Sequence, residues 1–323
     1  MRIITHPDRL PASSVSLARG CILTVGNFDG VHLGHQSLLR RTAEKALAAC
    51  LPAIAVTFDP HPLRVIQGAA APPLLMSLPR KLRLLDALGM DLALVLSFSA
   101  EVAASPPEDF VRDIFSHALH ARELIIGYDY AFGRNRRGNA DLLASLGGQY
   151  GFTLEQLDPV FFDGAIVSST RIRNALLAGD PAAAARLLGR PHYAEGMVMH
   201  GSHRGGPLLG FPTANIMPSK DFLLPMPGVY AVLATLEDGS PTRQGVANVG
   251  RNPTFGRESF HLEAHLLDLD RDLYDQRLGI HFIRRLRDER RFPSVPELME
   301  QIRRDAAQAR EILENLPPEE MPL

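Results

Sequence analysis

Two histidines, His32 and His35, lie three residues apart at the point where an apolar run gives way to a helical pattern. Cys21–Val25 is predicted to form a short buried strand, and Gly34–Ala49 a helix with one apolar face. Both imidazoles then lie at the N-terminus of the helix, where unpaired N–H groups and the helix dipole attract anions. The segment therefore predicts a phosphate site.

Three glycines, Gly26, Gly30 and Gly34, let the backbone of this segment turn sharply and approach a ligand closely. A zinc site is the alternative, because a single His-x-x-His pair is common in metal sites. Cys21 and Cys50 are the only cysteines of the chain, and neither has a ligand-like spacing to the histidines. We therefore favour phosphate binding over metal binding.

The stretch from His32 to His35 resembles the HxGH signature of nucleotidyltransferases. The resemblance implies that both imidazoles stabilise the charge on the α-phosphate of ATP while another phosphate attacks it, without a covalent enzyme intermediate. The chemistry would be electrostatic stabilisation and positioning. The resemblance also implies that the neighbouring Gly26, Phe28, Asp29 and Gly34 bind the nucleotide.

Short apolar runs and helical patterns alternate along the first 180 or so residues. Each predicted helix begins after a capping or helix-opening residue. This order predicts an α/β domain with a doubly wound, Rossmann-like parallel sheet, whose ligands collect at the carboxyl ends of the strands. The further predicted strands are Ala53–Phe58, Leu92–Phe98, Glu123–Ile126 and Thr153–Leu157, and the helices between them are Arg80–Leu88, Glu108–Leu119 and Asn139–Tyr150.

Three other segments rich in functional side chains lie close to the histidines in this predicted fold. Thr57–Pro62 follows the second strand and holds His61 between two prolines, which a rigid turn would explain equally well. Gly127–Gly138 follows the fourth strand and combines aromatic rings, a carboxylate and arginines. Ser168–Arg173 opens a helix whose hydroxyls can cap it and whose cations can reach a polyphosphate. We interpret these segments and the histidines as one site.

Together, these four segments resemble, in order and spacing, the N-terminal adenylyltransferase module of the bifunctional bacterial riboflavin kinase/FAD synthetase family. The resemblance implies an FMN adenylyltransferase domain over residues 1–184. Tyr130 stands where the family usually has phenylalanine, which keeps the aromatic ring. The contacts to ATP and flavin implied by the resemblance are His61, Asp129, Phe132, Arg136, Ser169, Thr170 and Arg173.

The composition changes after Gly179-Asp180-Pro181, and beyond an Ala-rich helix ending at Leu188 the pattern is β. Asp238-Gly239 is a hairpin signal, and Ser294–Glu297 is a capping box for a terminal helix. We predict an all-β domain, a small closed or nearly closed barrel with one C-terminal helix, over residues 185–323. The predicted strands are Tyr193–Met199, Gly228–Leu236, Gln244–Val249, Ser259–Leu267 and Arg277–Ile283.

The predicted barrel has two groups of side chains suited to chemistry. Thr213 and Asn215 lie two residues apart in an extended segment, so both can meet one hard cation that carries phosphates. Glu263 alternates with apolar residues and shares its face with His261 and His265. A strand-borne carboxylate there could act as general base for a hydroxyl, although a solvent-facing glutamate is the alternative.

This half of the chain resembles the riboflavin kinase module, through Gly210–Asn215, Gly228–Ala231, Asn248–Gly250, Glu263–Asp268 and Leu273-Tyr274. The resemblance implies Thr213 and Asn215 as Mg²⁺ ligands, Glu263 as the base acting on the ribityl 5′-hydroxyl, and Gly210 and Asn248 as substrate-binding residues. Two departures stand out. Gly206-Pro207 occupies a turn where a second arginine is common, and Asp275 occupies a position where glycine often follows Leu-Tyr.

Length and charge fit a cytoplasmic enzyme of two domains. The chain has 323 residues, about twice a typical domain, and a net charge of only -2, which argues against nucleic acid as a partner. The arginine-rich run Arg284–Arg291 contains acidic residues and is interpreted as a solvated strand end. No apolar stretch is long enough to span a membrane, and the first residues do not form a signal peptide. We expect both cysteines to be reduced, and a homo-oligomer is possible.

The sequence thus predicts an enzyme that makes FMN from riboflavin and ATP in the barrel, and FAD from FMN and a second ATP in the N-terminal domain. Both steps would use Mg²⁺. One alternative is an adenylyltransferase for another phosphorylated cofactor precursor, with the barrel recognising substrate. The other is a flavin-binding regulator that has lost one activity.

Overall fold

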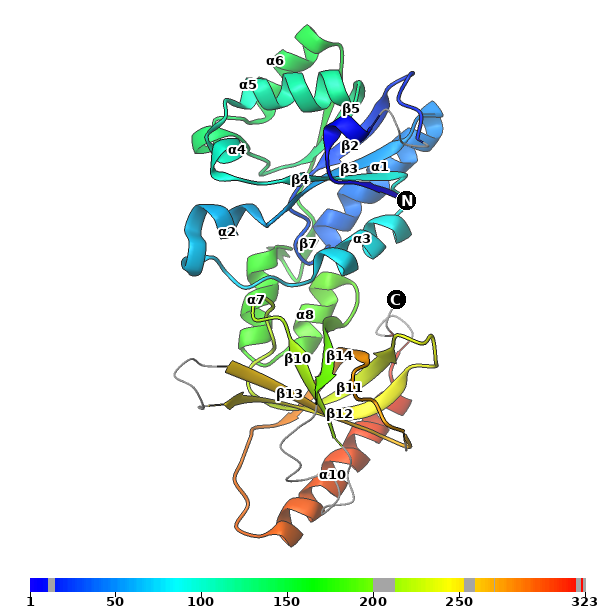
Figure 1. Cartoon of the computed structure of the whole chain (residues 1–323), viewed down its shortest axis with the longest axis vertical. Coiled ribbons are helices and arrows are strands. Elements are labelled where there is room, and N and C mark those ends of the chain that lie inside the picture. The colour runs from blue at the N-terminus through cyan, green and yellow to red at the C-terminus, as the bar shows by residue number, and fades with distance from the viewer. Residues whose placement is uncertain (11–14, 200–212, 253–258, 270, 318–320, 322–323) are drawn as a thin grey trace. The chain divides into compact units, whose positions relative to one another are not determined.

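The computed structural model describes residues 1–10, 15–199, 213–252, 259–269, 271–317 and 321 (Figure 1). The chain forms two compact units. The first consists of Met1–Pro72 and Ser77–Val167, and the second of Pro73–Met76 and Ser168–Leu323.

The first unit is built on a six-stranded sheet in the order β1-β4-β3-β2-β5-β6, with every pairing parallel. This confirms the predicted sheet. Because the chain runs from β2 outward through β3 and β4, and then returns to β5 beside β2, the topological switch point lies between β2 and β5. The strands are β1 (Arg2–Ile4), β2 (Cys21–Val25), β3 (Ala53–Asp59), β4 (Leu92–Ser97), β5 (Ala121–Gly127) and β6 (Thr153–Leu157).

Helices cover both faces of this sheet, with α5 and α6 on one side and α1 and α3 on the other (Figure 1). All five residues of β2 are buried, as expected for a central parallel strand. Leu23 and Val25 join one core cluster with Phe115 and Leu143, while α1 packs on β2 from the other face. The central strand is thereby held between two helical layers, and its carboxyl end is fixed in place.

Ser77 and Asn139 cap two helices of the first unit, each accepting a hydrogen bond from a backbone N–H of the first turn. The predicted helix over Glu108–Leu119 is two segments, because its hydrogen bonding changes to a π-helix at Val111. The helices are α1 (Leu33–Ala49), α2 (Pro62–Gln67), α3 (Leu78–Ala87), α4 (Ala100–Ala104), α5 (Pro107–Phe110) with its π-helical continuation (Val111–Ala118), and α6 (Ala140–Tyr150); 3-10 turns occupy Pro7–Arg9, Gly68–Ala70 and Arg134–Arg136, and a small hairpin pairs β7 (Phe161–Phe162) with β8 (Ala165–Ile166).

The second unit begins with α7 (Ser169–Leu177) and α8 (Pro181–Leu188), whose N-caps are Ser168 and Asp180. The two helices pack on each other, and α8 also packs on β14 and β9 of the barrel. Met226 N donates to Leu176 O at 2.9 Å, which ties α7 to the segment before β11.

The rest of the second unit is a closed antiparallel barrel in the order β10-β13-β12-β11-β14-β9, which confirms the predicted barrel. Its interior is apolar and includes the fully buried Tyr230 and Phe282. The strands are β9 (His192–Met199), β10 (Ala214–Pro218), β11 (Gly228–Leu236), β12 (Arg243–Asn252), β13 (Ser259–Leu266) and β14 (Arg277–Arg287).

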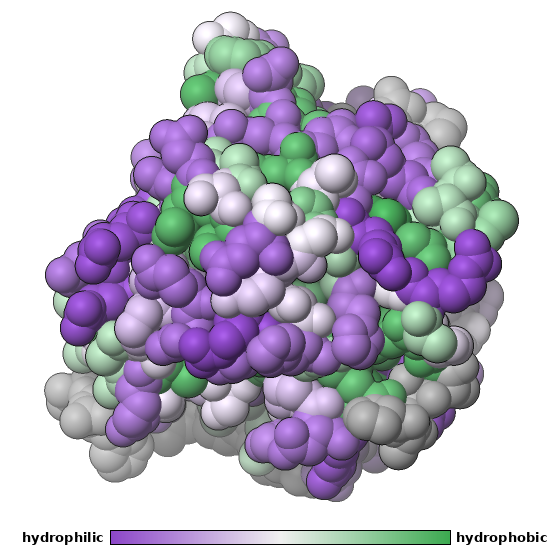
Figure 2. Space-filling view, turned by 90° about the horizontal axis from the view of Figure 1, so that it is seen from above, coloured by the Kyte–Doolittle hydropathy of each residue, from purple (hydrophilic) through white to green (hydrophobic). Residues whose placement is uncertain are grey.

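The terminal helix α10 (Val295–Glu314) covers one outer face of the barrel through Ala309 and Leu313. The two residues of its predicted capping box contact each other: Glu297 N donates to Ser294 Oγ at 3.5 Å, and that hydroxyl donates to Glu297 Oε1 at 2.9 Å. The residues that the structure describes include no helix long and apolar enough to cross a membrane. Figure 2 shows one face of the molecule, on which hydrophilic residues predominate and hydrophobic residues form small separate patches.

Candidate active sites

The loop between β2 and α1 brings the two predicted catalytic histidines together. His32 is the N-cap of α1, and its Nδ1 accepts a hydrogen bond from His35 N at 3.3 Å. In the neutral ring, Nε2 of His32 therefore carries the proton and is a donor. The two rings stack with centroids 3.6 Å apart and planes at 17°. This pair at a helix N-terminus is suited to an anion.

Packing around these rings explains two of the three glycines. A Cβ on Gly34 would lie 3.2 Å from the His32 ring, and one on Gly26 would lie 3.1 Å from the Phe28 ring. Phe28 in turn meets the His35 ring edge-on at 5.4 Å. Gly26 and Gly34 therefore leave room for the aromatic stack, whereas Gly30 takes a positive φ of 86°. Asp29 lies in the same loop and is buried.

Strand β2 lies between β3 and β5, so the loops that follow these three strands meet at one edge of the sheet. His61 follows β3 and is buried. Its Nδ1 accepts from Leu63 N at 3.1 Å and so caps α2. The segment thus serves as a helix start rather than only as a rigid turn, and in the neutral ring Nε2 of His61 carries the proton.

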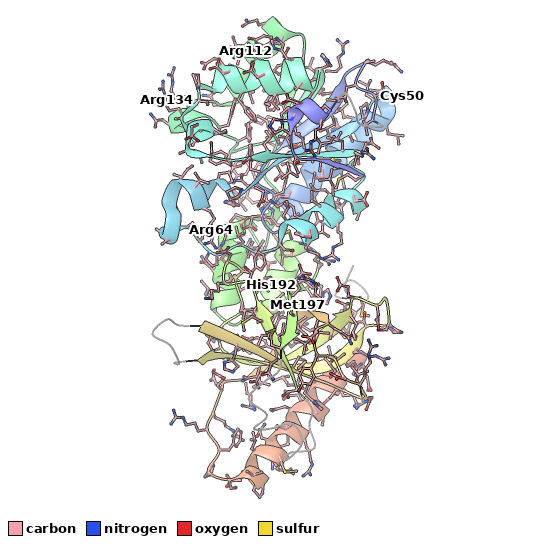
Figure 3. The ribbon with its side chains drawn as sticks, in the orientation of Figure 1. Cys50, Arg64, Arg112, Arg134, His192 and Met197 are labelled. Atoms are coloured by element: carbon pink, nitrogen blue, oxygen red, sulfur yellow. The ribbon has the colours of Figure 1, made fainter. Side chains whose placement is uncertain are left out.

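The loop after β5 is closed on itself around an aromatic pair. The Tyr130 and Phe132 rings stack at 5.4 Å, and Phe132 exchanges two backbone hydrogen bonds with Gly138, at 2.9 and 3.0 Å. A side chain on Gly138 would clash with the Phe132 ring. The loop exposes Asp129 and Arg136, and the labelled Arg134 of the same loop also extends outward (Figure 3). These side chains are available to a ligand.

The segment that opens α7 belongs to the second compact unit, whereas the histidines belong to the first. Ser168 caps the helix, accepting from Arg171 N at 3.3 Å. Ser169 is half-buried and Thr170 exposed in the first turn. Arg173 is buried, and its Nε donates to Pro73 O at 2.8 Å. One edge of the Arg173 guanidinium is therefore engaged with the protein.

The cysteines lie away from the histidine pair. Cys50 caps the opposite end of the 17-residue α1 (Figure 3), and Cys21 begins β2, five residues before the loop. Burial raises the pKa of Cys21 to about 12, so its thiol stays protonated. Within the described ranges, no group of three or more His, Cys, Asp or Glu side chains is placed to hold a metal ion.

In the barrel, three predicted residues are direct cross-strand neighbours. Asn215 of β10 pairs with Glu263 of β13, and Glu263 pairs with Asn248 of β12. Their sequence neighbours Ala214 and Leu262 lie in the barrel interior. Since side chains alternate along a strand, the two amides and the carboxylate share the outer face. The predicted face of Glu263 is therefore confirmed, and residues up to 48 positions apart in sequence form one row.

Two further residues border this row: His261, which the sequence indicated, and Glu289, which it did not. Glu289 Oε1 accepts from Asn248 Nδ2 at 3.2 Å. His261 pairs with Gly250 of β12, and a side chain at position 250 would clash with the His261 ring and with Glu289. The alternation along β13 indicated His261, whereas Glu289 comes from the charged run after β14 and carries no such signal. Among the residues that the structure describes, the buried Asn248 Oδ1 has no hydrogen-bond partner, so it can accept a hydrogen bond from a ligand.

The remaining predicted barrel residues are only partly described. Thr213 is exposed just before β10, two residues from Asn215, and Gly210 lies outside the described residues. Asp275 has a φ of 58°, the left-handed conformation that favours glycine, which gives a physical reason for the glycine expected there. The run Arg284–Arg291 includes the end of β14, but Arg287 is not solvated as predicted, because it pairs with the buried Asp305 at 2.7 Å.

Comparison with known proteins covers both units. A family model for FAD synthetase matches residues 14–171, and one for riboflavin kinase matches residues 188–313. Proteins named bifunctional riboflavin kinase/FMN adenylyltransferase are similar over nearly their whole length. That of Escherichia coli K12 is 39% identical over 292 residues, covering 90% of this chain and 92% of that protein. Those of Pseudomonas fluorescens and Bacillus subtilis are 42% and 33% identical, covering 90% and 97% of this chain and 93% and 98% of theirs.

A solved structure from Streptococcus pneumoniae, described as a macrolide-efflux protein, superposes with a TM-score of 0.83 at 28% identity and covers 98% of this chain and 99% of its own. Because both family models match, neither of the two alternatives drawn from the sequence gains support. The chain belongs to the bifunctional riboflavin kinase/FMN adenylyltransferase family, whose members phosphorylate riboflavin to FMN and adenylylate FMN to FAD.

Proposed function

We propose that the two reactions are divided along the chain, with adenylylation of FMN in residues 1–184 and phosphorylation of riboflavin in residues 185–323. The separate matches to FAD synthetase and riboflavin kinase support this division. The proposed boundary keeps α7 with the adenylyltransferase, although its compact packing is with the barrel. The FAD synthetase match ends at residue 171, inside the first turn of α7.

For adenylylation, we propose that His32 and His35 hold the α-phosphate of ATP at the N-terminus of α1. An oxygen of the FMN phosphate attacks the α-phosphorus, the bond to the β-phosphate breaks, and pyrophosphate leaves. The stacked rings and the helix dipole act on the charge that grows on the α-phosphate oxygens. The proposed nucleotide and flavin contacts are Gly26, Phe28, Asp29, Gly34, His61, Asp129, Phe132, Arg136, Ser169, Thr170 and Arg173.

For the kinase, we propose that Glu263 takes the proton of the ribityl 5′-hydroxyl. The oxygen of that hydroxyl attacks the γ-phosphorus of ATP, and ADP leaves. The observation that carries this role is the register of Glu263 between Asn215 and Asn248. The two amides can orient the hydroxyl and the phosphate on either side of the carboxylate. Within the described part of the chain, the buried Asn248 Oδ1 has no hydrogen-bond partner, which supports a substrate contact there.

We propose that Mg²⁺ binds at Thr213 and Asn215 together with the ATP phosphates. A hydroxyl and an amide oxygen beside the Glu263 carboxylate form the oxygen donor set that hard cations prefer. When bound, the ion would neutralise negative charge on the transferring phosphate. We also propose a cytoplasmic location, because both reactions consume ATP.

Replacement of His35 tests the adenylyltransferase site. His35→Ala should lower FAD formation from supplied FMN by about a hundredfold or more, the size of one lost transition-state contact. Riboflavin phosphorylation should persist, so FMN should accumulate from riboflavin and ATP. His6→Ala is the matched control, because His6 is exposed in the same unit. Unchanged FAD formation in His35→Ala would reject the assignment.

A further inference from the structure

Lys81 is a buried cation in the first unit that the proposed reaction does not use. It lies on α3, is 6% exposed, and belongs to the buried stripe of that helix with Leu84 and Leu85. Burial lowers its pKa, because removal from water disfavours the charged ammonium. Only three of the 34 basic residues of the chain are lysines. A charge kept at a position that would suit an apolar side chain indicates a role other than packing.

The contacts of Lys81 lead to the loop that holds the catalytic histidines. Its Nζ donates to Thr57 Oγ1 at 3.4 Å, and this hydroxyl donates to Asn27 O at 3.4 Å. Thr57 is fully buried near the carboxyl end of β3. The negative charges of Asp29 and Asp59 also act on the ammonium and favour its charged form. Lys81 therefore joins α3, the end of β3 and the loop after β2.

This loop needs such support because its backbone is strained. Phe28 and Val31 have φ values of 48° and 39°, in the left-handed region that L-residues avoid. Each costs roughly 1–2 kcal/mol, and such strain persists only where surrounding contacts fix it. Gln36 Nε2 holds one end by donating to Val31 O at 3.0 Å. The Thr57 hydroxyl holds the other end through its hydrogen bond to Asn27 O, and Lys81 Nζ donates to that hydroxyl.

We propose that Lys81 is a positioning residue for adenylyl transfer. It acts through Thr57 and the Asn27 carbonyl to hold Phe28, whose ring meets the His35 ring edge-on at 5.4 Å. Loss of the ammonium would let the strained loop relax and would displace His35 from the phosphate. A displacement of about 1 Å can cost about a hundredfold in rate. This inference rests on the proposed role of His35.

The test compares Lys81→Met with Lys45→Met, measuring steady-state FAD formation from supplied FMN and ATP. Methionine keeps the length and apolar stem of lysine but removes the charge. Lys81→Met should lower kcat about ten- to a hundredfold with a smaller change in the KM for ATP, and riboflavin phosphorylation should be unchanged. Lys45→Met, which loses ion pairs with Glu123 and Glu155, should keep kcat. Wild-type kcat in Lys81→Met would overturn the proposal.

Thr57→Val provides a second, nearly isosteric test that leaves Lys81 in place. It should lower kcat in the same way. The double variant should be no slower than the slower single variant, because Lys81 acts on the loop through Thr57. Full kcat in Thr57→Val, or additive losses in the double variant, would overturn the proposal even if Lys81→Met did not fold. His35→Ala, measured in parallel, separates the proposed role of His35 from that of Lys81. If His35→Ala loses FAD formation and the Lys81 and Thr57 variants do not, only the inference about Lys81 fails.

Selective labelling gives a readout besides activity. With three lysines in the chain, ¹³C-lysine NMR resolves each side chain. Saturating ATP should shift the Lys81 ε-carbon signal, since a polyphosphate near His35 changes the field at the linked ammonium, and the shift should vanish in His35→Ala if that variant no longer binds ATP there. In a second sample with ¹³C-labelled histidine, the His32 and His35 signals should also respond to ATP. A Lys81 signal that does not change with ATP while those histidine signals respond would contradict the coupling.

Discussion

Glu263→Gln is the most informative single change in the barrel, because it removes proton acceptance while keeping volume. Glu263 is half-buried on the outer face between Asn215 and Asn248, and glutamine can still hydrogen-bond to both neighbours. General-base catalysis contributes typically about 10² to 10⁴ in rate. We therefore expect kcat for riboflavin phosphorylation to fall by that factor, equivalent to roughly 3–5 kcal/mol in activation free energy.

The assay must count every turnover of the kinase, since the same chain converts FMN to FAD. The sum of FMN and FAD formed from riboflavin gives the kinase rate, and riboflavin and Mg-ATP affinities are measured separately. Adenylylation of supplied FMN should be unchanged. Glu237→Gln is the matched control, because Glu237 is an exposed carboxylate just after β11.

Stability separates a catalytic loss from misfolding. A half-exposed residue outside the barrel interior should change the free energy of unfolding by no more than roughly 0.5 kcal/mol. Near-normal kcat in Glu263→Gln would reject the base role and favour a solvent-facing glutamate. A loss of Mg-ATP affinity matching the loss of kcat would make Glu263 a ligand-positioning residue instead.

Three other predictions concern stability. Burial lowers the pKa of His192 from 6.5 to about 4, so protonation favours unfolding. The free energy of unfolding of the barrel should fall by up to about 3 kcal/mol between pH 6.5 and pH 4, and by less in His192→Gln. Equal pH dependence of the two proteins in urea denaturation would contradict this. Fragment 168–323 should have a higher melting temperature than fragment 185–323, because the shorter fragment begins inside α8 and lacks the Leu176–Met226 hydrogen bond. Equal melting temperatures would refute this prediction. Asp275→Gly should stabilise the barrel by up to about 1 kcal/mol, because glycine adopts the positive φ of this position without strain. A lower melting temperature would show that the contacts of the Asp275 carboxylate outweigh the backbone strain.

Much of the fold could be predicted because its central strands are buried. The bounds of the buried strands β2 and β11 match the predictions, and the helix caps Ser168 and Ser294 were found from their hydroxyls. Buried strands appear as continuous apolar runs between turn residues, which is a local signal. Short elements lack that signal, so the three-residue β1 and the helices α2 and α4 were not predicted.

The candidate sites were predictable where their residues are neighbours in sequence. His32 and His35 share one helix start, so their proximity followed from spacing alone. The row of Asn215, Glu263 and Asn248 depends on strand register, which a single sequence does not reveal. Lys81 was missed for a different reason: on a helix with an apolar face, a single cation within that face has no local signal that it is buried.

The central claim is that one chain carries two separate active sites that act in sequence, and mixing two single-site variants tests it most directly. His35→Ala given riboflavin and ATP should form FMN but little FAD, and Glu263→Gln should form little of either while converting supplied FMN to FAD. An equimolar mixture should restore FAD synthesis from riboflavin, because FMN released by one variant is used by the other. If either variant alone makes FAD from riboflavin at the wild-type rate, or if the mixture accumulates FMN without FAD, the account is contradicted.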